Sequence, residues 1–102
     1  MKIELEFLVD TGAIYTVVSK PVAERIALKE MSRRKFKTGS GVVEMPIAEA
    51  YLTLDREGVT TLVAVSSDEE MPILLGVTTL ELLGLQVDPV TGKLKPLELL
   101  IL

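Results

Sequence analysis

Phe7-Leu8-Val9-Asp10-Thr11-Gly12-Ala13 is the stretch that decides the fold of this chain. An apolar, strand-like run ends in a carboxylate, and the Thr-Gly pair after it favours a tight turn. The chain has no histidine and no cysteine. Those absences exclude Ser-His and Cys-His nucleophiles and the usual zinc ligand sets, so acid–base chemistry falls to carboxylate, lysine or tyrosine. Two carboxylates that share a proton can activate water for attack on an amide, and a short chain obtains the second one by dimerising.

Length and composition narrow the classes of protein that fit. The 102 residues are enough for one domain with its own core, which we place at 1–102. Hydrophobic residues make up 48% of the chain and aromatic residues only 4%, which indicates an interior of Leu, Val and Ile. The net charge of −4 argues against a nucleic-acid partner, because phosphate binding needs a basic face.

The sequence also argues against a membrane partner. No apolar stretch approaches the roughly 20 residues that span a bilayer. The N-terminus alternates apolar and acidic residues, so it is typical of a strand over 2–9 and not of a signal peptide. Together with the absence of cysteine, this favours a cytoplasmic location.

Several short strands and two short helices follow the first strand. Thr16-Val17-Val18 is β-branched and predicts a strand, and Ser19 is placed to cap a helix that has Pro21 in its first turn. Two hairpins are then expected, one over 34–50 with a glycine-containing tip and one over 50–66 that turns at Asp55 to Gly58. The basic stretch from Arg33 to Lys37 is typical of a solvated edge strand.

The segment at 73–84 has its own pattern. Ile73-Leu74-Leu75 predicts a short buried strand that ends at Gly76. Thr78 and Glu81 have capping-box spacing for a helix that Gly84 would end. Residues 88–92 indicate a turn, and Leu97–Leu102 a last strand. The fold class is therefore mainly β, closed-barrel-like, with one or two short helices.

Two stretches resemble the signatures of retropepsins, the retroviral-type aspartic proteases. Residues 7–18 are similar to the active-site loop of that family, and residues 73–84 are similar to its second signature, an apolar pair and a glycine followed by a helix. The two stretches occur in the family's order, and the first hairpin lies between them where the family has its flap. The resemblance covers roughly residues 5–100 and implies the acid protease fold.

The resemblance implies a role for each residue of the active-site loop. Asp10 would supply one carboxylate of a catalytic dyad, completed by Asp10 of a second subunit. Thr11 would hydrogen-bond across the homodimer, and the carbonyl of Gly12 would accept a hydrogen bond from a peptide or protein substrate. Ala13 would leave room beside the carboxylates, and Ile14 would border a substrate subsite.

The other signature residues would shape the site without taking part in the chemistry. Gly39, Ser40 and Gly41 would form the tip of a flap over the substrate. Leu74 and Leu75 would be core residues beside the active-site turn, and Gly76 would permit close packing there. Such a site needs no metal and no cofactor.

Two departures from the retroviral pattern have consequences. Retroviral members carry an Asp and an Arg that pair, at the positions of Ile14 and Val77 here. Because both charges are absent, no buried charge is left without its partner. The matching positions are paired in the family, so Ile14 should lie in or near contact with Val77. Nine residues precede Asp10, fewer than in the retroviral relatives, so we expect a weaker dimer interface. The apolar strand at 97–102 should pair with the same strand of the second subunit, across the two-fold axis of the homodimer.

Two other interpretations remain at the level of sequence. The chain could be a binding or assembly module on the same fold, in which no dyad is used. It could also be an unrelated small β-barrel in which Asp-Thr-Gly is an ordinary turn.

Overall fold

The computed structural model describes residues 2–99 and residue 101. In this part of the chain the strands are β1 (Leu8–Val9), β2 (Thr16–Ser19), β3 (Glu30–Thr38), β4 (Gly41–Leu54), β5 (Glu57–Ser66), β6 (Leu74–Leu75), β7 (Leu85–Val87) and β8 (Leu94–Pro96). The helices are α1 (Lys20–Arg25) and α2 (Val77–Leu82). The prediction of a mainly β fold with two short helices is therefore confirmed.

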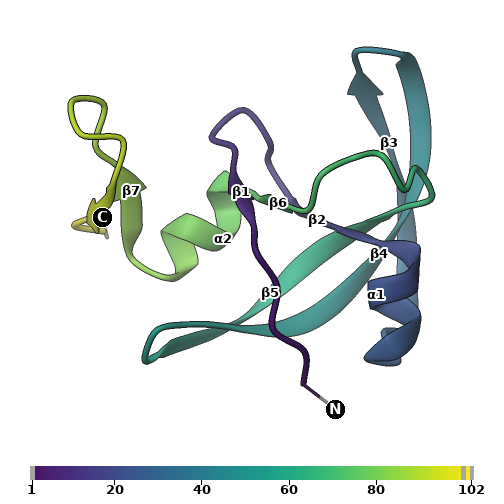
Figure 1. The fold of residues 1–102 in the computed structure, drawn as a ribbon, viewed down its shortest axis with the longest axis horizontal. Helices are drawn as coiled ribbons and strands as arrows, with labels where there is room; N and C mark the ends of the chain where they lie inside the picture. The colour runs from purple at the N-terminus through teal and green to yellow at the C-terminus, as the bar shows by residue number, and fades with distance from the viewer. Residues whose placement is uncertain (1, 100, 102) are drawn as a thin grey trace.

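Six strands form one mixed sheet in the order β1-β6-β2-β5-β4-β3, and β7 pairs with β8 in a separate two-stranded sheet (Figure 1). The larger sheet has β1 at one edge and β3 at the other. Within the described residues no strand joins these two edges, so the sheet does not close and the expectation of a closed barrel is wrong. With only two residues, β1 is too short to extend the sheet further round.

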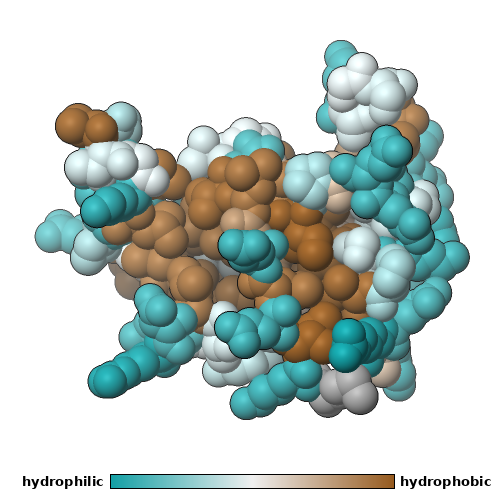
Figure 2. All heavy atoms as spheres, viewed as in Figure 1, coloured by the Kyte–Doolittle hydropathy of each residue, from teal (hydrophilic) through white to brown (hydrophobic). Residues whose placement is uncertain are grey.

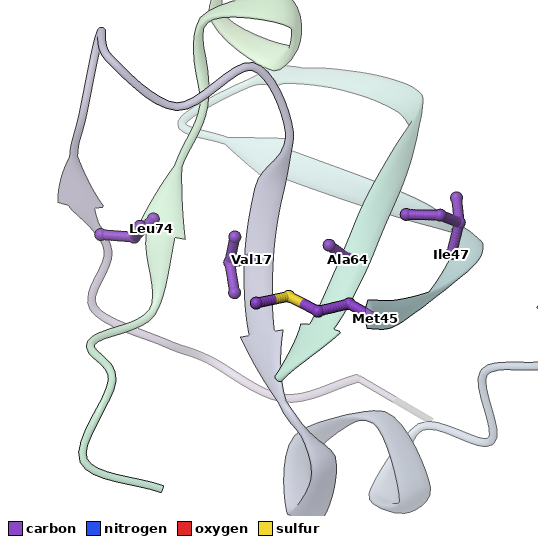
Figure 3. Close-up of a cluster of buried hydrophobic side chains, with 5 residues drawn as sticks. All are labelled: Val17, Met45, Ile47, Ala64 and Leu74. Carbon is purple, nitrogen blue, oxygen red and sulfur yellow. The ribbon is translucent and has the colours of Figure 1, made fainter. Parts of the chain in front are cut away.

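The large sheet is packed on both faces, because successive residues of its strands point to opposite sides. One face carries the Val17 cluster, shown in Figure 3, which consists of Val17, Met45, Ile47, Ala64 and Leu74. The other face carries Val18, Ala48 and Val63, and Ala23 of α1 packs against them. The helix therefore covers one face and leaves the side of the Val17 cluster for other elements.

The two predicted hairpins and the first helix are confirmed. Strands β3 and β4 pair from Glu30↔Ala48 to Thr38↔Gly41, and β4 and β5 pair up to Leu54↔Glu57. At the second turn Asp55 adopts a left-handed φ of 53°, a conformation that Asp tolerates. Ser19 caps α1, since its hydroxyl accepts a hydrogen bond from the Val22 N–H at 3.5 Å.

The first strand is shorter than predicted. Residues 2–7 show the expected alternation of exposed and half-buried side chains, but only Leu8 and Val9 pair with a neighbour. The ladder partner of this segment is β6, and the Leu8 N–H already bonds to the Ile73 carbonyl. Residues 71–73, which precede β6, are not in a strand, so the ladder does not continue toward the N-terminus.

The last strand was predicted over 97–102, and this is wrong for the residues that the structure describes. Leu97–Leu99 and Ile101 are not in a strand, and Leu100 and Leu102 lie outside the described residues. The strand is instead β8, which pairs with β7 from Leu85↔Pro96 to Val87↔Leu94. After Pro96 the chain continues alongside this pair for one more residue, because the Leu97 N–H bonds to the carbonyl of Gly84.

The capping box predicted at Thr78 is also wrong. The N-cap of α2 is Gly76, two residues before Thr78, and no side chain forms a hydrogen bond at that cap. Gly84 does end the helical region as predicted, with a φ of 70°. The cap differs from the sequence pattern because other parts of the chain supply partners for the first N–H groups of the helix.

A chain of buried hydroxyl groups ties three elements together. Thr16 of β2 accepts a hydrogen bond from the Gly76 N–H at 3.0 Å and donates to the hydroxyl of Thr79 at 2.7 Å. The Thr79 hydroxyl lies 2.8 Å from that of Thr61, which donates to the Leu62 carbonyl at 3.4 Å. Each hydroxyl can thus accept once and donate once, and each of these threonines is at most 3% exposed.

We predict that Thr79→Val destabilises the fold by about 1–3 kcal/mol, because it leaves the buried Thr16 hydroxyl without its acceptor. Valine keeps the shape of threonine, so any loss of stability is due to the missing hydroxyl group. Thr60→Val is the matched control, since Thr60 is exposed on the same strand as Thr61. Thermal unfolding of both variants checks this, and equal melting temperatures would show that the hydroxyl chain contributes nothing.

Candidate active site

The Asp10 loop is fixed at its start by β6. The Asp10 N–H donates to the Leu75 carbonyl at 3.0 Å, which places the loop at the carboxyl end of β1. The Asp10 carboxylate then turns back on its own loop, where its Oδ1 accepts a hydrogen bond from the Gly12 N–H at 2.9 Å. The Ala13 N–H donates to the Asp10 carbonyl at 3.1 Å. The loop is therefore a tight turn whose geometry holds the carboxylate half-buried.

Helix α2 fixes the other end of the loop. The Val77 N–H donates to the Ala13 carbonyl at 2.8 Å, and the Thr78 N–H donates to the Ile14 carbonyl at 3.2 Å. The first N–H groups of a helix have no partner within it, so the loop satisfies two donors that would otherwise need a cap. These bonds also place Ile14 beside the start of α2, as predicted from the two departures at Ile14 and Val77.

Gly76 lies against the backbone of the active-site loop. A Cβ atom at this position would stand 2.5 Å from the Tyr15 carbonyl oxygen and 2.8 Å from the Thr16 nitrogen. No side chain fits there, because real Cβ contacts are not that short. Leu74 and Leu75, which precede it, are 7% and 3% exposed, so they are core residues as predicted.

A groove of about 640 Å³ runs between the Asp10 loop and β3. Its floor is the side of the Val17 cluster that α1 leaves uncovered, with Val17, Met45 and Leu74 among the lining residues. The loop contributes Asp10, Gly12, Ala13 and Ile14 to one wall, and residues 34–39 of the first hairpin form the other. The structure thus brings most of the predicted active-site residues to one concave surface.

Asp10 is the only carboxylate among the residues that line this groove. Acid–base catalysis on an amide by carboxylates needs two such groups, one to accept and one to donate a proton. Within the described residues, no three acidic groups come together in a way that could hold a metal ion. The described part of one chain therefore brings one carboxylate to this groove.

A scan against protein-family models bears on one of the interpretations that the sequence left open, the unrelated small β-barrel, and argues against it. The model described as "gag-polyprotein putative aspartyl protease" matches residues 2–82, which include the Asp10 loop, the first hairpin and the start of α2. The chain belongs to this aspartyl protease family. No curated protein matches the chain.

The tip of the first hairpin has a defined geometry. Thr38 donates from its hydroxyl to the Gly41 carbonyl at 2.9 Å and accepts from the Ser40 N–H at 3.3 Å. Gly41 needs its lack of a side chain, because its φ is 118°, whereas Gly39 does not adopt a positive φ. Gly39 lines the groove, and Ser40 lines a neighbouring cavity of about 240 Å³.

Three loop residues are exposed, namely Thr11, Gly12 and Ile14, and Ile14 is 67% exposed. All three lie in the stretch that resembles the retropepsin active-site loop. In the described part of the chain, no helix is long and apolar enough to cross a membrane.

Sequence reasoning missed the contacts that join the loop to the rest of the site. Tyr15 packs edge-on against Phe36 of β3, with ring centroids 5.7 Å apart, so the loop and the first hairpin meet through an aromatic pair. Thr16 holds Gly76 and Thr79 from the other side. The β-branched run that starts at Thr16 indicates a buried strand, but nothing local to it shows a partner 63 residues away.

We predict that Gly76→Ala lowers the stability of the protein by at least about 1–3 kcal/mol, because the backbone of Tyr15 and Thr16 must move away from the new methyl group. Gly39→Ala is the control, since no atom lies within 4 Å of a Cβ there and its φ suits alanine. Urea unfolding measures both. A Gly76→Ala protein as stable as Gly39→Ala would contradict the close crossing.

Proposed function

We propose that this protein is an aspartic endopeptidase that works as a homodimer, with one Asp10 from each subunit. Membership of the aspartyl protease family supports hydrolysis of peptides at the coarse level. The observation that carries the finer proposal is the position of Asp10. Its carboxylate is half-buried, oriented by the Gly12 N–H and placed on the wall of a groove with an apolar floor.

The chemistry follows from two carboxyl groups brought into contact. Like charges repel, so the pair keeps one proton between them. The ionised carboxylate takes a proton from a water molecule, whose oxygen attacks the carbonyl carbon of the peptide, while the protonated carboxyl donates to the carbonyl oxygen. The tetrahedral intermediate then breaks at the C–N bond. The carboxyl group that took the proton from water gives it to the leaving amine, and the other carboxylate takes a proton back from a hydroxyl of the intermediate, which restores the pair. No metal and no cofactor enters these steps.

The need for a second chain rests on two observations. The groove of one chain holds one carboxylate. Figure 2 shows apolar side chains gathered across the face on which β1 and α2 lie. The large apolar residues exposed on and around these elements are Leu8, Val9, Ile14, Leu82, Leu99 and Ile101. A surface of this kind marks an interaction site, and a second copy that covers it would bring the other Asp10 loop with it.

The substrate would lie in the groove as an extended peptide. By the family resemblance, the Gly12 carbonyl would accept a hydrogen bond from this peptide, and Thr11, which is exposed, would contact the other loop of the dimer. The tip at Gly39 to Gly41 would act as the flap, and the Thr38 bonds define where it bends.

We predict that Asp10→Asn abolishes hydrolysis while the fold survives. Asparagine keeps the acceptor that the Gly12 N–H uses, but it cannot take a proton from water. The rate of peptide cleavage should fall at least about a thousandfold, in the range expected for loss of a general acid–base group. Cleavage of a peptide library followed by mass spectrometry measures this, with Asp55→Asn as the control because Asp55 is exposed in the turn after β4.

Two results would contradict the proposal. Cleavage by purified Asp10→Asn at the rate of the unaltered protein would show that another group does the chemistry. An unaltered protein that binds peptides but cleaves none, at concentrations where it is dimeric, would favour the binding module.

A further inference from the structure

Strand β3 gives the groove a positive wall. Four charged residues line the groove, and three of them are cations of β3, namely Arg34, Lys35 and Lys37. The fourth is Asp10. The groove is thus cationic in a chain whose net charge is −4, so its charge is opposite to that of the protein as a whole.

Arg34 stands on the groove side of β3. In the pairing of β3 with β4 it lies opposite Met45, which is buried in the Val17 cluster. Phe36, two residues further along, packs against the same cluster, so strand alternation gives Arg34 the same face. An arginine in this position can rest its aliphatic stem on the apolar floor and keep its guanidinium at the open side of the groove.

Its neighbour Arg33 has a different environment. Arg33 points to the opposite face, where its guanidinium lies 2.9 Å from Glu30 and 3.6 Å from Glu44. Among the described residues, Arg34 forms no ion pair with any carboxylate. The charge of Arg34, which faces the groove, is therefore available to a ligand, whereas the charge of Arg33, which faces away, is paired with Glu30 and Glu44.

We propose that the groove selects peptides with an acidic side chain, and that Arg34 is the residue that recognises it. This rests on the proposed function, since it takes the groove as the substrate site. A guanidinium pairs with a carboxylate through two parallel hydrogen bonds, which gives direction as well as attraction. Lys35 and Lys37 alternate with Arg34 and so lie on the face of Arg33, from which they add only to the general positive potential of the strand.

Asp10 limits where the acidic residue of the substrate peptide can lie in the groove. A carboxylate at the bond to be cleaved would meet the negative charge of the catalytic pair and be repelled. The acidic side chain must therefore be displaced along the peptide, on the part that runs beside β3. Acidic residues at the two positions that flank the cleaved bond should be disfavoured.

The test uses synthetic peptides that share one apolar cleavage site and carry Glu, Gln or Lys at each position in turn. With the unaltered protein, Glu at one or two displaced positions should raise kcat/KM about three- to tenfold over Gln, as expected for a partly exposed charge pair. Arg34→Gln should remove this preference, and Arg34→Glu should reverse it in favour of Lys. Arg33→Gln is the matched control on the same strand and should keep the preference for Glu.

A second measurement separates this proposal from the proposed function. Fluorescein-labelled versions of the same peptides are titrated with Asp10→Asn, which binds without cleaving. Tighter binding of the Glu peptide that Arg34→Gln abolishes supports acidic recognition, even if no variant of the protein cleaves. Asp10-dependent cleavage with no difference among Glu, Gln and Lys, or a preference for Glu that survives Arg34→Glu, would overturn the assignment and leave the protease proposal intact.

Discussion

Gly76 crosses the backbone of Tyr15 and Thr16 with no room for a side chain between them, and the rest of the site depends on this crossing. It lets the first N–H groups of α2 reach the carbonyls of Ala13 and Ile14, and it lets the Thr16 hydroxyl accept from Gly76. The buried Thr79 continues the same set of bonds into β5. Since hydrogen bonds in a buried site are costly to break, the loop that carries Asp10 is held by the helix that follows the second motif.

This arrangement shows how the two stretches that resemble the retropepsin signatures, residues 7–18 and 73–84, combine into one site. Neither stretch forms the site alone, because the Asp10 turn needs the Leu75 carbonyl at one end and the start of α2 at the other. It also explains why the fold tolerates apolar residues at Ile14 and Val77. The two segments meet through backbone bonds, so a charged pair of side chains is not required to join them.

The sequence predicts local features well and long-range ones poorly. The turn at Asp10, the cap at Ser19 and the two hairpins are encoded by neighbouring residues, and the structure has them. The cap of α2 could not be predicted, because its hydrogen-bond partners come from Ala13 and Ile14. Apolar alternation indicates strands at both termini, but pairing begins only at Leu8 in the first and shifts to Leu94–Pro96 in the last. The site was predicted through its motif, whereas the Tyr15–Phe36 contact and the cationic wall at Arg34 required the pairing register.

The central claim is that one chain holds half of a catalytic pair, so a working site needs two chains. The most direct measurement is the stoichiometry of a peptide analogue with a hydroxyl group in place of the scissile carbonyl, which mimics the tetrahedral intermediate. Native mass spectrometry of the titrated protein should show one analogue bound for every two chains, and the Asp10→Asn protein should bind it far more weakly. One analogue on each single chain, with Asp10→Asn binding equally well, would contradict the claim.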